Sequence, residues 1–282
     1  MALLFKNDLT LNTVAPPPLI GAVIMAAGAG RRMGHYPKSL LQREGEPLLL
    51  RQARLLRQAG IAHTVVVLGH HAERLMPVLQ QARALPAANH AWTRPPPLEE
   101  GWDRSQIERG ADGSGRWLPS LPSPTGGRGK TAPETHPPGL YWTVNPTPDA
   151  GPGSSLRRGL SALPPDLAAV MVMLGDQPLL EAEDVAAVLA AWRARAAHID
   201  LVLPEHEGQP GHPLVFGPAM REAVLRQTGG AGVRDWRRAH PNRVQALPSA
   251  HARYTTDIDT PPDIERLHKQ TGVALTGLAD LC

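Results

Sequence analysis

The stretch IMAAGAGRRMGHYPKSLL, residues 24–41, carries three glycines, two arginines and a lysine close together. It continues an apolar run, LIGAVIM (19–25), that has the length and β-branched content of a buried strand. Glycine lets the backbone approach a ligand closely, and amide N–H groups freed by a turn can point at an anion. The stretch therefore predicts a strand followed by an anion-binding turn that contains Gly28 and Gly30.

Apolar runs and amphipathic segments alternate along the rest of the chain. This alternation is typical of an α/β fold with a mostly parallel, twisted sheet and helices on both faces, because parallel strands need crossover connections. In such sheets, ligands bind at the carboxyl ends of the strands. We expect further strands at 63–69, 140–145, 168–174 and 199–204, and helices at 47–60, 71–85, 154–163 and 180–196.

One segment interrupts the alternation. Residues 86–139 contain 10 Pro and 8 Gly in 54 positions, a composition that buries too little apolar surface to offset the entropy of ordering. We predict a disordered low-complexity insertion in one crossover of a single domain, residues 19–272. Residues 1–18 are expected to form a flexible leader and 273–282 a tail.

Charge and cysteine content restrict the function classes. The 29 Lys and Arg against 26 Asp and Glu leave a formal net charge of +3, which disfavours a nucleic-acid partner because phosphate-backbone binding needs a clustered basic face. The only cysteine, Cys282, has no internal disulfide partner, which fits a reducing compartment. We expect a cytoplasmic protein without a membrane span, since no apolar run approaches ~18 residues.

The loop matches neither of the two commonest phosphate-binding patterns. The dinucleotide fingerprint G-x-G-x-x-G fails because Gly34 comes one residue late, and the P-loop fails because three residues separate Gly34 from Lys38. A tight turn with solvated arginines is the alternative interpretation. Arg32 and Lys38 favour an anion-binding loop over that alternative, because both add positive charge beside the bare backbone.

Five motifs, in order, are similar to one family. They are AAGAGRRMG (26–34) followed by a lysine, GPGSSLRRGL (151–160), LGDQP (174–178), GQPGHPLVF (208–216) and DIDTPPDIERL (257–267). This series resembles the nucleotidyltransferases that share the fold of the molybdenum cofactor guanylyl- and cytidylyltransferases, over roughly residues 19–85 and 140–270. AAG at 26–28, with SSL and GHP, is most similar to the cytidylyltransferases, which transfer CMP from CTP to molybdopterin. One departure is the third residue between Gly34 and Lys38, where the family often has two.

The resemblance implies nucleotidyl transfer, and the residue types fit that chemistry. Arg32 and Arg31 can form bidentate hydrogen bonds with the β- and γ-phosphates of a nucleoside triphosphate, and Lys38 supplies a point charge near the α-phosphate. We expect Arg32, Lys38 and Asp176 to be catalytic. The predicted nucleotide-binding residues are Ala26, Ala27, Gly28, Ala29, Gly30, Arg31, Ser154, Ser155 and Asp176.

Three aspartates are candidate ligands for Mg²⁺. Asp176 directly follows a predicted strand, and Asp257 and Asp259 are alternate residues of an extended segment, so they share a face. Mg²⁺ takes one or two carboxylates together with phosphate oxygens, and the resemblance makes Asp259 the direct ligand and Asp257 a secondary or alternate one. The alternatives are a turn role for Asp176 and, for the DIDTP segment, capping of the following helix by its Asp and Thr residues; capping and metal binding are compatible.

The remaining candidates belong to the acceptor side and to the base. Ser154 and Ser155 open a predicted helix, where hydroxyl and free N–H groups suit an anion or a pyrimidine edge; simple N-capping is the alternative. Gly211, His212, Pro213 and Arg157 are acceptor-binding residues by resemblance, although His212 has an ordinary loop histidine as its alternative. The histidines show no zinc-ligand spacing.

We therefore expect a Mg²⁺-dependent enzyme that uses CTP and molybdopterin and serves a molybdoenzyme or its accessory chaperone. Guanylyl transfer, or transfer to another small phosphate, stays open within the same class. A different class also stays open, because relatives of this fold include reductases and non-catalytic proteins that deliver a cofactor.

Overall fold

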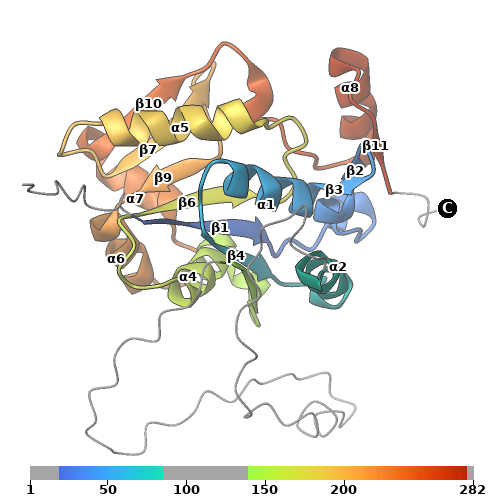
Figure 1. The fold of residues 1–282 in the computed structure, drawn as a ribbon, viewed down its shortest axis with the longest axis horizontal. Coiled ribbons are helices and arrows are strands. Elements are labelled where there is room, and N and C mark those ends of the chain that lie inside the picture. The colour runs from blue at the N-terminus through green and yellow to red at the C-terminus, as the bar shows by residue number, and fades with distance from the viewer. Residues whose placement is uncertain (1–18, 85–138, 278–282) are drawn as a thin grey trace, which may run out of the picture.

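An eight-stranded sheet lies at the centre of the part of the chain that the computed structural model describes, residues 19–84 and 139–277 (Figure 1). The strand order is β10-β7-β9-β6-β1-β4-β5, with β8 paired to β7. Neighbouring strands run parallel except where β8 or β9 takes part. The strands are β1 (Ile20–Ala26), β4 (His63–Leu68), β5 (Gly139–Val144), β6 (Ala169–Leu174), β7 (Leu201–His206), β8 (Gln209–Pro210), β9 (Leu214–Phe216) and β10 (Val244–Pro248).

Helices cover both faces of this sheet (Figure 1). Alternate residues of β1 divide between two cores: Ala22 and Ile24 pack on one face, and Val23 packs on the other. The first face is covered by α1 (Leu48–Gln58), α2 (Ala72–Ala84) and α5 (Ala182–Ala194), the second by α4 (Pro152–Ala162), α6 (Pro218–Arg226) and α7 (Val233–Ala239). The predicted α/β class, with a mostly parallel sheet and helices on both faces, is confirmed.

A second, smaller sheet lies beside α8 (Pro261–Thr271) and has the order β11-β2-β3. It is formed by β2 (Gln42–Arg43), β3 (Glu46–Pro47) and β11 (Leu275–Thr276). A third apolar cluster joins the loop after β1 to the segment before α8, through Met33, Tyr36, Leu41, Leu48, Ile258 and Leu267. This cluster holds two stretches that are distant in the sequence at one end of the large sheet.

The predicted elements agree with the observed ones to within two residues at each end. Two boundaries differ from the prediction. Gly139, expected in the insertion, begins β5 because its N–H donates to Ala62 O at 2.7 Å. Leu275 and Thr276, expected in the tail, form β11 and pair with β2. The leader 1–18 and the rest of the insertion lie outside the described residues.

No helix within residues 19–84 and 139–277 has both the length and the apolar character needed to cross a bilayer.

Candidate active site

The glycine loop lies at the carboxyl end of β1 and contains one glycine that the fold requires. Gly30 has φ 58°, and a Cβ atom there would come within 2.1 Å of Tyr36 O. Its carbonyl accepts hydrogen bonds from the N–H groups of Met33 and His35 at 2.8 and 3.0 Å. A Cβ at Gly28, by contrast, would meet nothing within 4 Å. The space over Gly28 is therefore free for a ligand.

The outer side of this loop is held by residues that sequence analysis did not single out. His71 Nε2 lies 3.0 Å from Ala29 O. Asp149 Oδ1 lies 2.9 Å from Arg31 Nη2 and 3.2 Å from His70 Nε2. The only sequence signal was position, because His70 and His71 follow the β4 run directly and so must lie at the same end of the sheet as the loop.

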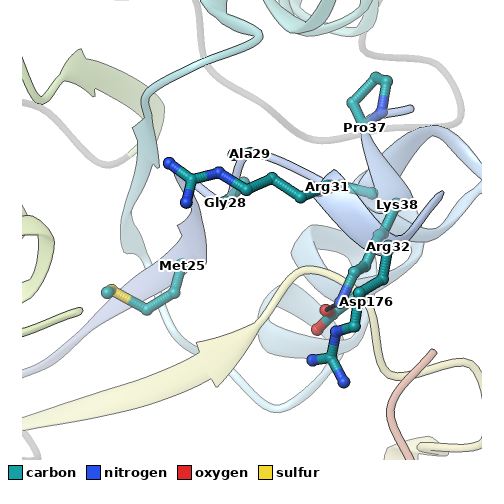
Figure 2. A pocket seen from close by; sticks show the side chains of 11 residues that line it. Met25, Gly28, Ala29, Arg31, Arg32, Pro37, Lys38 and Asp176 are labelled. Atoms are coloured by element: carbon teal, nitrogen blue, oxygen red, sulfur yellow. Dashed lines mark ion pairs between the residues drawn. The ribbon is translucent and has the colours of Figure 1, made fainter. Parts of the chain in front are cut away.

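Cationic side chains surround a cavity of about 340 Å³ above the loop (Figure 2). Arg31 and Arg32 lie on the 3-10 turn Arg31–Met33, and Lys38 begins a second 3-10 turn, Lys38–Leu40. Of the residues predicted to bind nucleotide or act in catalysis, eight line this cavity: Ala26, Gly28, Ala29, Gly30, Arg31, Arg32, Lys38 and Asp176. Met25, Pro37 and Ser39 complete its wall.

Lys38 connects two aspartates that come from segments distant in the sequence, one after β6 and one before α8. Its Nζ lies 3.6 Å from Asp176 Oδ2 and contacts Asp259 Oδ1. Asp259 Oδ2 also accepts a hydrogen bond of 2.6 Å from Arg32 Nη2. The three-residue spacing between Gly34 and Lys38 therefore lets the lysine reach the aspartates, as Figure 2 shows for Asp176.

The two aspartates differ in their acidity. Burial raises the pKa of Asp176 to about 6, against the opposing attraction of Lys38. Burial would also raise the pKa of Asp259, but its contacts with Lys38 and Arg32 outweigh burial and hold the pKa below its usual value. Asp176 is thus a carboxylate whose negative charge is only partly compensated in the free protein.

The position of Asp176 follows from the strands around it. Gly175 N donates to Met25 O at 2.9 Å, so the residue after β6 lies against the end of β1. The next side chain, Gln177, is 1% exposed, and its Nε2 donates to Tyr254 O at 2.7 Å. Ile258 N lies 3.4 Å from Asp176 O, which brings the segment containing Asp259 alongside.

The helix α8 is capped by the threonine of the DIDTP motif and not by its aspartates. Thr260 is the N-cap, and Asp263 Oδ2 accepts from the N–H groups of Asp259 and Thr260 at 3.0 and 2.7 Å. The carboxylate of Asp259 is therefore available to Lys38 and Arg32. Asp257 and Asp259 both line a second hollow of about 240 Å³ beside α8, and burial raises the pKa of Asp257, with Asp259 adding to the effect.

The residues present fit a divalent cation that also needs ligands from a substrate. No group of three or more His, Cys, Asp or Glu side chains within the described ranges is arranged to hold a metal ion alone. Asp176 and Asp259 face a common cation, the Lys38 ammonium, from two sides. Two carboxylates with phosphate oxygens make up the ligand set that Mg²⁺ commonly takes in phosphate-transferring sites.

The serine pair lies in the first turn of α4, outside the lining of the cavity. The helix begins at Pro152 with Gly151 as its N-cap, so neither serine caps it, and that alternative is wrong. Asn145 Nδ2 donates to Ser154 Oγ and to Ser155 Oγ, both at 2.9 Å. Asn145 is 4% exposed, and sequence analysis missed it because a single asparagine after a strand carries no distinctive signal.

The predicted acceptor residues occupy two separate places, both outside the lining of the cavity. Arg157 donates to Ala231 O at 2.8 Å and also to Gly229 O, so its guanidinium holds a glycine-rich loop against α4. His212 N donates to Tyr254 O at 2.9 Å, and Gly211 lies against Tyr254 with no room for a Cβ. Pro213 leads into β9.

Burial lowers the pKa of His212 to about 4. The imidazole is therefore neutral near pH 7 and supplies no positive charge to an acceptor phosphate. It can still donate or accept one hydrogen bond.

A cationic loop after the first strand of this sheet faces Asp176 at the end of β6 and Asp259 before α8, an arrangement that fits the nucleotidyltransferase class of α/β proteins. The chain belongs to the family described as MobA-like NTP transferase domains, whose model matches residues 22–100 and 125–244. The predicted resemblance is confirmed. The match enters both ends of the predicted insertion 86–139, and it stops before Asp257 and Asp259.

Individual relatives share only a low sequence identity with this chain. Nicotine blue oxidoreductase of Paenarthrobacter nicotinovorans is 26% identical over 263 residues, which cover 89% of this chain and 97% of that protein. A nucleotidyl transferase from Methanothermobacter thermautotroptrophicus superposes with a TM-score of 0.57 at 17% identity, over 89% of this chain and 97% of that one. A manganese complex of Rv0371C from Mycobacterium tuberculosis H37Rv superposes with a TM-score of 0.52 at 19% identity, over 90% and 100%. At these identities the two solved structures establish the fold alone.

Proposed function

We propose that the protein transfers CMP from CTP to the phosphate of molybdopterin. An oxygen of the acceptor phosphate forms a bond to the α-phosphorus, the bond from that phosphorus to the bridging oxygen breaks, and pyrophosphate leaves. The observation that carries this proposal is the position of Lys38, which contacts Asp259 and lies 3.6 Å from Asp176 at the mouth of the glycine loop.

The chain's own groups supply positioning and charge. Because the attacking phosphate is already an anion, the reaction needs no strong general base, and the main obstacle is repulsion between negative groups. The amides of residues 26–30 hold phosphate oxygens, and Arg31 and Arg32 neutralise the leaving pyrophosphate. Lys38 reduces the negative charge around the α-phosphate.

Asp176 and Asp259 would hold the divalent cation, Mg²⁺. When bound, the cation neutralises charge on the phosphates as a Lewis acid. Two observations support a divalent ion: both carboxylates face one cationic group in the free protein, and the solved Rv0371C neighbour is a manganese complex.

The choice of CTP and molybdopterin rests on the resemblance of the AAG, SSL and GHP motifs to the cytidylyltransferases. We assign the base to the side of Ser154 and Ser155, and the acceptor to the side of Gly211, His212 and Pro213. Arg157, on the same helix as the serines, is kept as an acceptor contact on the resemblance alone. The product would pass to a molybdoenzyme or its accessory chaperone in the cytoplasm. Guanylyl transfer, or another small phosphate acceptor, would use the same groups.

A second candidate function is reduction, and one observation favours it. The relative from Paenarthrobacter nicotinovorans carries the name of an oxidoreductase and matches 89% of this chain. Against it stands the placement of Lys38 and Arg32 on the carboxylates of Asp176 and Asp259, an arrangement that hydride transfer does not require.

One assay separates the candidates. The purified protein is incubated with Mg²⁺, molybdopterin and each of the four labelled nucleoside triphosphates, and pyrophosphate is measured. We expect release with CTP and a CMP-linked product. Pyrophosphate release with GTP alone would show that the enzyme is a guanylyltransferase. Release with none of the four nucleotides would reject the transferase class. Consumption of a reduced nicotinamide cofactor in its place would favour the oxidoreductase.

A further inference from the structure

The ammonium group of Lys38 occupies the position between two carboxylates that the proposed function gives to a divalent cation. Its Nζ is 3.6 Å from Asp176 Oδ2 and in contact with Asp259 Oδ1. The side chains of Lys38, Asp176 and Asp259 are 19%, 22% and 31% exposed, so water screens these charges only in part. Arg32 adds a second cationic contact to Asp259 at 2.6 Å.

In the free site the carboxylates of Asp176 and Asp259 thus lie against two cationic side chains, Lys38 and Arg32. A divalent cation that entered alone would have to displace Lys38 from both carboxylates and would leave its ammonium beside a doubly charged ion. A nucleotide that entered alone would draw Lys38 and Arg32 onto its phosphates and leave Asp176 and Asp259 beside those same anions. Each step separates opposite charges in a partly buried site, which is unfavourable.

Entry of both ligands together avoids that separation. Lys38 and Arg32 move from carboxylate to phosphate, and Asp176 and Asp259 exchange an ammonium for the divalent ion. Every charge then keeps an opposite partner. The two bindings are thus linked through one lysine, and linkage of this kind is reciprocal between the two ligands.

We propose that Lys38 is an exchangeable counter-ion that makes the metal and the nucleotide bind interdependently. This role rests on the proposed function for the identity of the ligands. It predicts that Lys38, in addition to contacting the α-phosphate, keeps Asp176 and Asp259 from holding a divalent ion before the nucleotide arrives.

The test is Mn²⁺ binding in the absence of nucleotide, followed by electron paramagnetic resonance of the free ion. We expect Lys38→Met to bind Mn²⁺ at least about tenfold more tightly than the wild type, within the ~5- to 150-fold span of such couplings. Lys269→Met, on the exposed surface of α8, removes the same charge elsewhere and is expected to leave Mn²⁺ affinity unchanged. The double variant Lys38→Met/Asp259→Asn should lose the gain.

Equal Mn²⁺ affinity in the wild type and Lys38→Met would overturn the proposal, as would an equal gain in Lys269→Met. Melting curves verify that each variant is folded, and Lys38→Gln replaces Lys38→Met if the latter unfolds. The result is independent of turnover. If the wild type transfers a nucleotide but Lys38→Met shows no increase in Mn²⁺ affinity, only the counter-ion role is wrong. If Lys38→Met shows the increase but the wild type transfers no nucleotide, the proposed function is wrong and the counter-ion role stands.

Discussion

Arg32 Nη2 lies 2.6 Å from Asp259 Oδ2, although the two residues are 227 positions apart in the chain. The contact joins the loop after β1 to the segment before α8, which the third apolar cluster also holds together through Met33 and Ile258. A triphosphate that binds Arg32 must therefore approach Asp259 as well. This proximity is the geometric basis of the predictions below.

Asp259→Asn is expected to lower kcat/KM for the nucleotide by at least about a hundredfold, because the loss of a metal-binding carboxylate removes several kcal/mol of charge stabilisation. Steady-state pyrophosphate release measures the effect. Glu265→Gln removes an exposed carboxylate from α8 and is the matched control, expected to keep activity within about twofold. An equal loss of kcat/KM in the two variants would show that Asp259 has no specific role in the reaction.

Two glycines of the loop are expected to respond differently to alanine. Gly28→Ala places a Cβ in open space, so the melting temperature should hold while nucleotide affinity falls by roughly tenfold or more, because the methyl group occupies the phosphate position. Gly30→Ala should lower the melting temperature, because φ is 58° and the Cβ would overlap Tyr36 O. Thermal melting and nucleotide titration together test the pair; unchanged nucleotide affinity in Gly28→Ala would place the phosphates elsewhere.

Asn145→Ala is expected to raise the KM for the nucleotide by roughly tenfold with a smaller change in kcat, because Ser154 and Ser155 lose the two hydrogen bonds that position them, each worth ~1 kcal/mol. Thr143→Val is the control. It removes the hydrogen bond of 3.0 Å from Arg158 Nε to Thr143 Oγ1, which also joins β5 to α4. A comparable rise in KM in both variants would show that Asn145 only stabilises the fold.

The contribution of His212 to the stability of the protein is expected to fall as the pH is lowered from about 6.5 to about 4. The raised pKa of Asp176, about 6, contributes with the opposite sign over part of this interval, so the effect of His212 is obtained by comparing the wild type with His212→Asn. Burial lowers the pKa of His212 from 6.5 to about 4, so over this interval the unfolded state takes up a proton that the folded state does not. The free energy of unfolding then decreases with falling pH, by up to about 3 kcal/mol from this group. Urea unfolding at several pH values measures the difference in the free energy of unfolding between the wild type and His212→Asn, which should shift against the wild type as the pH falls from about 6.5 to about 4; a difference that does not change with pH would contradict the assignment.

The sequence predicted the central sheet well because its strands are short, buried on both faces and rich in β-branched residues. The run 168–174 became β6 almost unchanged, and Asp176 therefore lies at a strand end, as expected. The turn chemistry of 26–34 also located the loop, because glycines with cationic neighbours have few other uses.

Other features depend on contacts that no local pattern encodes. The strand β11 was missed because Leu275 and Thr276 have too few neighbours to show a period, and only pairing with β2 makes them a strand. The contacts of Arg157 with the carbonyls of Gly229 and Ala231, a loop more than 70 positions away, could not be predicted from its motif. The role of Asn145 could not be predicted from the sequence, because it depends on the packing of α4 against the end of β5.

The anomalous signal of Mn²⁺ in a crystal grown with a non-hydrolysable CTP analogue shows which carboxylates hold the metal. We expect one strong peak within about 2.5 Å of carboxylate oxygens of both Asp176 and Asp259, with the triphosphate over Gly28 and with Lys38 moved onto a phosphate. A metal bound away from these two aspartates, or a triphosphate outside the glycine loop, would contradict the proposed site.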